Sequence, residues 1–209
     1  MNIHSCYGVK ERWFLSKKRG QKYDQIIDAA VKVIAKHGFH QAQVSKIAKE
    51  AGVADGTIYL YFKNKEDLLV SLFDKKLGAF VERSRRRLAK EHSIEAKFRL
   101  LVESHFSQLE DNYDLAVVTQ LELRQSKSEL RQRINQVLKG YLTLLDELIA
   151  EGKAEGCFHP ELDPLLARQM VFGVMDEVVS NWVMAEGKFP LKKQAENVHH
   201  LLLHGLRGK

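Results

Sequence analysis

The chain of 209 residues is 44% hydrophobic and 29% charged, with a formal net charge of +6. Residues 1–65 carry 12 Lys and Arg against 5 Asp and Glu, whereas residues 66–209 carry 21 against 22. No apolar run approaches the roughly 20 residues of a membrane span, and the distant Cys6 and Cys157 match no metal or redox spacing. We therefore expect a cytoplasmic protein with no membrane contact, no metal and no bound cofactor.

The basic first third predicts a head that binds an anion, although a merely basic, soluble surface is an equal alternative on charge alone. At the N-terminus, MNIHSCYGVKERWF lacks hydrophobic periodicity and leads into the basic LSKKRGQKY. We treat residues 1–21 as a basic arm and expect residues 1–18 to be poorly ordered. Because such an arm suits a DNA-binding head, we hypothesise that translation begins at Leu15. A Leu15 codon other than UUG or CUG would remove that hypothesis.

Hydrophobic periodicity predicts helices along almost all of the remaining chain, and no segment reads as a strand. Gly38 is placed to end the first helix, and Gly52 ends the second. Asp55 is the expected N-cap of the third, and Asn64 caps a long fourth helix. The predicted helices span residues 23–38, 43–51, 55–61, 64–91, 94–111, 115–126, 128–156, 163–187 and 190–208.

The stretch VADGTIYLYFKNKEDLL, together with the residues just before it, follows the spacing of a helix-turn-helix, in which two short helices cross over a tight turn. Gly52 supplies the residue that tolerates positive φ in the turn. Ala48 is small where the second helix crosses the first, and Ile58 packs beneath the crossing. On this pattern alone, an ordinary helical hairpin is the alternative.

With Ile58 facing inward, the neighbouring side chains of the third helix are free to enter the major groove of DNA. Gly56 would let the backbone approach the duplex closely. The hydroxyl groups of Tyr59 and Tyr61 would donate hydrogen bonds to phosphates. Such contacts fix the register of the protein on the DNA without reading its sequence. Core packing is the alternative for Tyr61 and Phe62, and we assign Phe62 to the core.

The stretch VSKIAKEAGVADGTIYLYFKNKEDLL resembles the signature of the TetR family of transcriptional regulators, over about residues 22–70. The resemblance implies an all-α fold with an N-terminal three-helix helix-turn-helix head at 22–68. A C-terminal helical body for ligand binding and dimerisation would follow at 69–209. Ala54 and Asp55 stand where many members of the family have Ser followed by another small or charged residue. Because Asp55 would place a negative charge near DNA, we assign it to capping, with a cytosine contact as a minor alternative. By position, the implied DNA contacts are Gln43, Ser45 and Lys46 before the turn, and Gly56, Thr57, Tyr59, Tyr61 and Lys65 after it.

The last two helices each carry an apolar stripe, which predicts a four-helix dimer interface with twofold symmetry. The resemblance implies the same homodimer, bound to a double-stranded DNA operator. Packing inside the body alone is the alternative for these stripes. They consist of Leu166, Met170, Val171, Val174, Val178 and Trp182, and of Ala195, Val198, Leu202 and Leu206.

The segment TQLELRQSKSELRQRINQVLKGYL alternates apolar residues with charged and amide side chains. With YLYFKNKEDLL, it resembles the acyl-CoA-responsive regulators of fatty-acid degradation in the TetR family. That resemblance implies a long-chain acyl-CoA effector, which requires an apolar tunnel with a basic mouth. Ordinary core packing is an equal alternative for any single candidate. The tunnel candidates are Phe106, Leu109, Leu121, Val137, Tyr141, Phe172 and Met175, and the candidates for the polar end are Gln120 and Arg124.

Two other functions stay open at this stage. One is a TetR-type repressor of an efflux or stress gene that responds to another hydrophobic molecule, and the other is a helical interaction protein that never binds DNA. An enzyme is not expected, because the chain has no GxSxG, HExxH or P-loop motif. His200 and His204 are spaced i,i+4 as in some metal sites, but we favour a surface or interface position. The run RSRRR at 83–87 suits the end of a helix, with an anion site as the alternative.

Overall fold

The computed structural model describes residues 5–207, and their side chains from residue 20 onward. Within that part of the chain every regular element is a helix, apart from an isolated β-bridge between Phe158 and Arg207. This confirms the all-α prediction. The chain divides into two compact units after Leu72, close to the boundary expected after residue 68. None of the described helices is long and apolar enough to cross a membrane.

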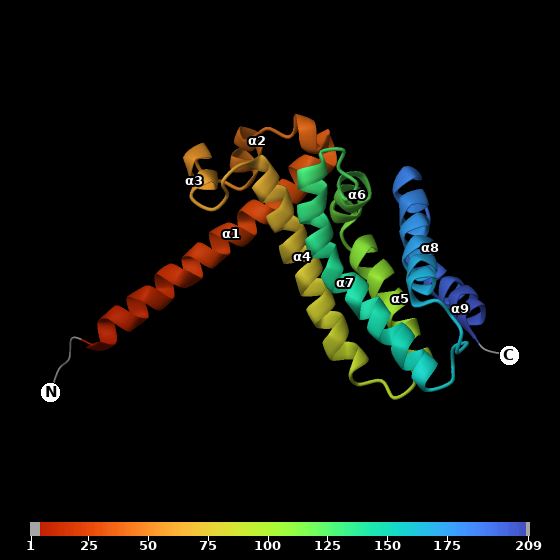
Figure 1. The fold of residues 1–209 in the computed structure, drawn as a ribbon. Helices are drawn as coiled ribbons and strands as arrows, with labels where there is room; N and C mark the ends of the chain where they lie inside the picture. Colours follow the sequence, from red (N-terminus) through yellow and green to blue (C-terminus); the bar gives the residue numbers. More distant parts are fainter. Residues whose placement is uncertain (1–4, 208–209) are drawn as a thin grey trace. The chain divides into compact units, whose positions relative to one another are not determined.

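The head contains α1 (Ser5–Gln41), α2 (Val44–Glu50) and α3 (Asp55–Tyr59), followed by the first turns of α4 (Lys65–Leu88) (Figure 1). Gly38 has a positive φ of 72° and breaks α1, as its position predicted. The chain is helical from Ser5, which includes part of the stretch assigned to a basic arm. Residues 1–4 lie outside the described residues, and the poor order expected for residues 1–18 stays a prediction.

A small apolar core closes the helix-turn-helix. Gly52 has a φ of 66° in the turn, and the N–H of Val53 donates to the carbonyl oxygen of Ala48 at 3.0 Å. Ala48 and Ile58 are both buried, together with Ile47 of the same helix as Ala48. The structure therefore confirms the packing that the spacing of these residues predicted.

The body contains α5 (Ile94–Glu110), α6 (Tyr113–Glu122), α7 (Ser128–Ala154), α8 (Pro164–Met184), the 3₁₀ turn η1 (Lys192–Gln194) and α9 (Ala195–Leu206). It is built around α5, which packs against α6, α7, α8 and α9. Phe98 and Phe106 of α5 are fully buried, and the ring of Phe98 meets that of Phe158 edge to face. Side-chain caps begin three of these helices, with Ser93 before α5, Asn112 before α6 and Asp163 before α8.

The apolar stripe of α9 faces the interior of its own chain, which corrects its assignment to a dimer interface. All four residues of the stripe are buried within the chain, where α9 packs mainly against α5 and also against α8. On α8 the predicted stripe is divided, since Val171 and Trp182 are buried whereas Leu166 is exposed. The large apolar side chains that the last two helices do expose are Leu165, Leu166, Met184 and Leu201.

Candidate DNA-binding surface and ligand cavity

The N-terminus of α3 differs in one detail from the sequence prediction. The N-cap is Ala54, which makes no side-chain capping bond, and Asp55 is the first residue of the helix. The prediction that Asp55 is the cap was therefore wrong by one position. Its carboxylate still lies in the first turn, where the helix dipole favours a negative charge.

Four of the predicted DNA contacts lie on or next to α3. Tyr59 is 58% exposed and Gly56 is exposed, whereas Thr57 and Tyr61 are half-buried. A Cβ added to Gly56 would meet no atom of the protein within 4 Å, so internal packing does not require a glycine here. Phe62 is buried, which confirms its assignment to the core.

Lys65, the first residue of α4, is fastened to the end of α1. Its Nζ donates to the carbonyl oxygen of His40 at 2.9 Å and lies 4.8 Å from the centre of the Phe39 ring. Asn64 caps α4 as predicted, since its Oδ1 accepts from the N–H of Asp67 at 2.8 Å. An ammonium group has three N–H donors, so this bond to His40 leaves Lys65 able to donate to a phosphate.

The three predicted contacts before the turn lie at the start of α2. Gln43 is the N-cap and has an extended backbone, and Ser45 and Lys46 are exposed in the first turn. Desolvation, with the nearby charges of Lys46 and Lys36, lowers the pKa of His37. Desolvation is the largest of these causes, and the charges of Lys46 and Lys36 add to it.

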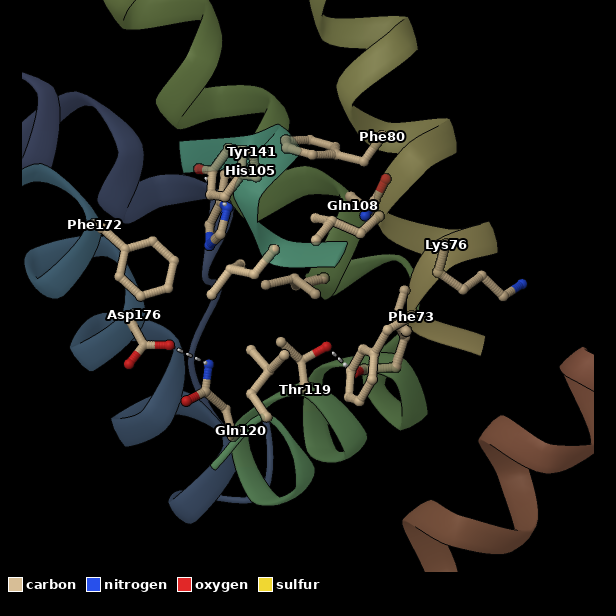
Figure 2. Close-up of a pocket in the computed structure, with 15 residues that line it drawn as sticks. Phe73, Lys76, Phe80, His105, Gln108, Thr119, Gln120, Tyr141, Phe172 and Asp176 are labelled. Atoms are coloured by element: carbon tan, nitrogen blue, oxygen red, sulfur yellow. Dashed lines mark hydrogen bonds between the residues drawn. The ribbon is translucent and has the colours of Figure 1, made fainter. Parts of the chain in front are cut away.

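A cavity lies in the body among α4, α5, α6, α7 and α8 (Figure 2). It encloses about 60 Å³, whereas pockets for drug-sized ligands usually enclose about 300–1,000 Å³. A long ligand would therefore require this cavity to widen. The wall from α4 consists of Phe73, Lys76, Leu77 and Phe80.

Aromatic rings form one end of the cavity. The rings of His105 and Tyr141 stack with centroids 5.8 Å apart and an interplanar angle of 13°. Phe80 and Phe172 pack edge-on against Tyr141. The Tyr141 hydroxyl and Nδ1 of His105 are hydrogen-bonded at 3.1 Å. Burial lowers the pKa of His105 to about 4 and raises the pKa of Tyr141, so both side chains are neutral near pH 7.

Polar side chains occupy another part of the cavity, away from the stacked rings in Figure 2. The carboxylate of Asp176 accepts from the amide of Gln120 at 3.3 Å and forms an ion pair with Arg124. Asp176 is mostly buried while Arg124 is exposed, so this ion pair lies at the rim. Among residues 5–207, no three His, Cys, Asp or Glu side chains are placed together to hold a metal ion.

A second and more polar groove lies beside the cavity, between α4 and α5. It encloses about 300 Å³, and Phe80 and Gln108 line both spaces. Arg87 donates to Oγ of Ser104 at 2.8 Å, while Ser84 is buried and its Oγ has no partner among the described residues. Of the RSRRR run, Arg83 and Arg87 line this groove and bring positive charge next to the apolar cavity, whereas Arg85 and Arg86 form ion pairs with glutamates.

The structure brings part of the predicted ligand site together. Arg124 reaches the rim through its ion pair with Asp176. Leu121 is 60% exposed on α6, because a helix turns by about 100° per residue and Leu121 directly follows the cavity-lining Gln120. The predicted residues that line the cavity are Leu109, Gln120, Tyr141 and Phe172. Those that do not are Phe106 and Met175, which are fully buried, Leu121, and Val137, which is half-buried on α7.

Sequence reasoning missed the α4 wall and the inward polar residues. Phe73, Leu77 and Phe80 recur at i, i+4 and i+7, so their periodicity did indicate a buried face on α4. His105 gave no signal in the sequence, because no carboxylate lies at a metal-binding spacing from it. Asp176 gave no signal, because it approaches the cavity from α8 and its partners Gln120 and Arg124 are distant in the sequence.

Comparison with known proteins identifies the class that this head and body define. Residues 26–72 match the family described as "Bacterial regulatory proteins, tetR family" and residues 73–205 match "YsiA-like protein, C-terminal region". The chain belongs to the TetR family of transcriptional regulators.

Several relatives share this architecture along their whole length. The fatty acid metabolism regulator protein of Bacillus subtilis is 54% identical over 193 residues, which cover 92% of this chain and 100% of that protein. The fatty acid degradation regulator FadR of Bacillus halodurans is 63% identical, with a TM-score of 0.86, over 88% of this chain and 100% of its own. FadR of B. subtilis, solved in complex with stearoyl-CoA, is 55% identical with a TM-score of 0.86 and the same coverage.

Proposed function

We propose that this chain is a repressor of fatty-acid degradation genes that binds a palindromic operator as a homodimer and is released by a long-chain acyl-CoA. The observation that carries the proposal is the 55% identity, over 88% of the chain, to a regulator solved with stearoyl-CoA. The apolar cavity in the body supports it, because an alkyl chain requires an apolar enclosure.

In this proposal, α3 enters the major groove and the residues around it hold the phosphates. Gly56 and Tyr59 lie at the groove, and Tyr61 and Lys65 donate to the DNA backbone. Gln43, Ser45 and Lys46 hold the backbone from the start of α2. Two heads related by a twofold axis would then prefer half-sites about 34–36 Å apart, or a multiple of that distance.

The dimer is proposed to form through the outer faces of α8 and α9. Leu166 and Leu201 are both more than half exposed there, and fully burying a Leu side chain contributes about 1.5–3 kcal/mol. Leu201→Arg should therefore produce monomers in sedimentation experiments and weaken operator binding. Leu121→Arg is a matched control, since Leu121 is similarly exposed but lies on α6. A dimer that survives both Leu201→Arg and Leu166→Arg would place the interface elsewhere.

The acyl chain is proposed to enter the cavity beside the stacked rings of His105 and Tyr141. Gln120 and Arg124 lie at the polar rim, and the groove that contains Arg87 supplies further positive charge for the phosphate-rich end. Because the cavity encloses only about 60 Å³ here, the ligand must widen it and move its walls.

The wall on α4 links this widening to the DNA-binding residues. α4 begins with Lys65 and continues without interruption through Phe73 and Phe80, which line the cavity. A ligand that displaces this wall would therefore shift α4. That shift would favour a spacing between the two heads of the dimer that does not fit the operator. A hundredfold loss of operator affinity requires about 2.7 kcal/mol of differential ligand binding. A few additional buried methylenes, at about 0.8 kcal/mol each, would supply it.

A titration of the operator complex with acyl-CoAs of graded chain length tests the proposal. Release should strengthen from short to long chains, and free CoA should have little effect. Equal release by acetyl-CoA or CoA would reject the apolar tunnel. Operator binding that no acyl-CoA disturbs would favour another hydrophobic inducer. A gel shift with the DNA upstream of its own gene comes first, since no shift would favour a helical interaction protein.

A further inference from the structure

His105 has a buried nitrogen that makes no hydrogen bond with any described residue. This nitrogen, Nε2, is closed off from solvent, although the His105 side chain lines the cavity. The other ring nitrogen, Nδ1, is hydrogen-bonded to the Tyr141 hydroxyl at 3.1 Å. Leaving a buried polar atom unpaired is unfavourable, so a ligand that pairs with Nε2 gains affinity.

The hydrogen bond to Tyr141 determines which nitrogen of His105 carries the proton. A neutral imidazole has one N–H donor and one acceptor nitrogen. If the Tyr141 hydroxyl donates to Nδ1, the proton lies on Nε2, and Nε2–H alone is left unpaired. If Nδ1–H donates instead, both the phenol proton and the Nε2 lone pair are left unpaired. The first arrangement leaves fewer buried groups unpaired, so Nε2–H is a donor at the cavity wall.

The surroundings of His105 restrict which acceptor can reach this donor. The ring lies 6.1 Å from that of Phe80 and 5.8 Å from that of Phe106, between centroids, and stacks on Tyr141. A phosphate or carboxylate would lose its hydration against such a wall, whereas a neutral carbonyl oxygen loses much less. In an acyl-CoA, the thioester carbonyl is the acceptor that is bonded directly to the alkyl chain.

We propose that Nε2–H of His105 donates a hydrogen bond to the thioester carbonyl of the bound acyl-CoA, with Tyr141 holding the imidazole in the required tautomer. His105 would then distinguish an acyl-CoA from an alkyl ligand of equal length that lacks the carbonyl. This inference rests on the proposed function, because it takes an acyl-CoA as the ligand.

The test compares palmitoyl-CoA with S-hexadecyl-CoA, a thioether with the same alkyl length and no carbonyl oxygen. Calorimetry on the full-length protein should give about tenfold tighter binding of the thioester, as expected for one satisfied buried donor. In His105→Phe the two affinities should become equal, mainly through loss of thioester affinity. His105→Gln keeps an N–H donor and should retain part of the preference. Tyr141→Phe should reduce the preference, because Nδ1 then lacks the hydroxyl that fixes the tautomer.

Two results would overturn the inference in distinguishable ways. If the native protein binds thioester and thioether equally tightly, or if His105→Phe weakens both alike, His105 does not recognise the carbonyl and the proposed function still stands. If neither ligand binds the native protein, the proposed acyl-CoA response fails and the inference fails with it.

Discussion

The head and the body of this chain direct their polar groups in opposite ways. In the head, Tyr59 and Lys46 lie exposed around a small packed core, and the bond of Lys65 to His40 holds an ammonium group near the surface. In the body, His105 and Asp176 are directed inward and line a cavity. In the proposed function, DNA recognition is therefore carried by a surface that one short motif determines, and ligand recognition by an interior assembled from five helices.

Truncation in the body should have the largest effect on stability. Phe98 is fully buried at the centre of the body, so Phe98→Ala should lower the free energy of unfolding by about 3–5 kcal/mol. Leu121→Ala removes an exposed side chain of the same helical body and should change it by less than about 0.5 kcal/mol. Denaturant unfolding measures both. A comparable loss in Leu121→Ala would mean that Leu121 faces the interior after all.

Acid should destabilise the body through its inward-facing histidines. The pKa of His105 falls from 6.5 to about 4 in the folded chain, so the unfolded chain binds a proton first as the pH falls. Stability is therefore lost between about pH 6.5 and 4, by at most about 3 kcal/mol from His105, with little further loss below pH 4. Burial also lowers the pKa of His199, which adds loss in the acid range. The free energy of unfolding should depend less steeply on pH in His105→Phe than in the native protein. An unchanged slope would show that His105 does not cause the loss of stability in acid.

Substitution of the exposed tyrosine should separate binding from stability in the head. Tyr59→Ala should weaken operator binding by at least about 1 kcal/mol and change the free energy of unfolding by less than about 0.5 kcal/mol. Lys65→Ala should instead lower affinity for all DNA sequences alike. It should also reduce the slope of the logarithm of the binding constant against the logarithm of the salt concentration by about one unit. Fluorescence anisotropy with operator and random DNA distinguishes the two. Unchanged operator binding in both variants would show that this surface does not meet DNA.

The smallest effect is expected for Gly56→Ala, which should stabilise the fold while it weakens DNA binding. Gly56 lies within α3 with open space around its Cα, so Gly56→Ala should stabilise the head by about 0.4–1 kcal/mol. The added methyl group should nevertheless weaken operator binding, because the DNA backbone closely approaches that position in the proposed complex. Thermal unfolding and a gel shift on the same sample measure the two changes. Operator binding that improves along with stability would indicate that no close approach occurs.

The two units also differ in what their sequences predicted. Ala48, Gly52 and Ile58 lie within eleven positions of one another, so local spacing alone fixed the turn, the crossing and the exposed face. Predicting the site in the body required the rotation of each helix about its axis, which periodicity leaves ambiguous when two neighbouring residues are both plausible candidates. Leu121 and Gln120 were both predicted at the site, but only Gln120 lines the cavity.

The stripe on α9 left a different question open, namely which surface it packs against. Its apolar periodicity was correct, but a stripe does not reveal whether it packs on its own chain or on a second copy. In the structure α9 packs within its own chain, mainly against α5 and also against α8. The polar group at the aromatic end was hidden for a further reason, since the His105 and Tyr141 pair joins α5 to α7 and neither residue indicates the other in the sequence.

The central claim is that ligand and operator bind to competing states of one protein. The most direct test is to measure the affinity of palmitoyl-CoA for the free protein and for the operator complex under the same conditions. Linkage requires the operator to weaken palmitoyl-CoA by the same factor by which palmitoyl-CoA weakens the operator. The factor by which the operator weakens palmitoyl-CoA binding and the factor by which palmitoyl-CoA weakens operator binding should be equal and large. An acyl-CoA affinity that operator DNA leaves unchanged would contradict it.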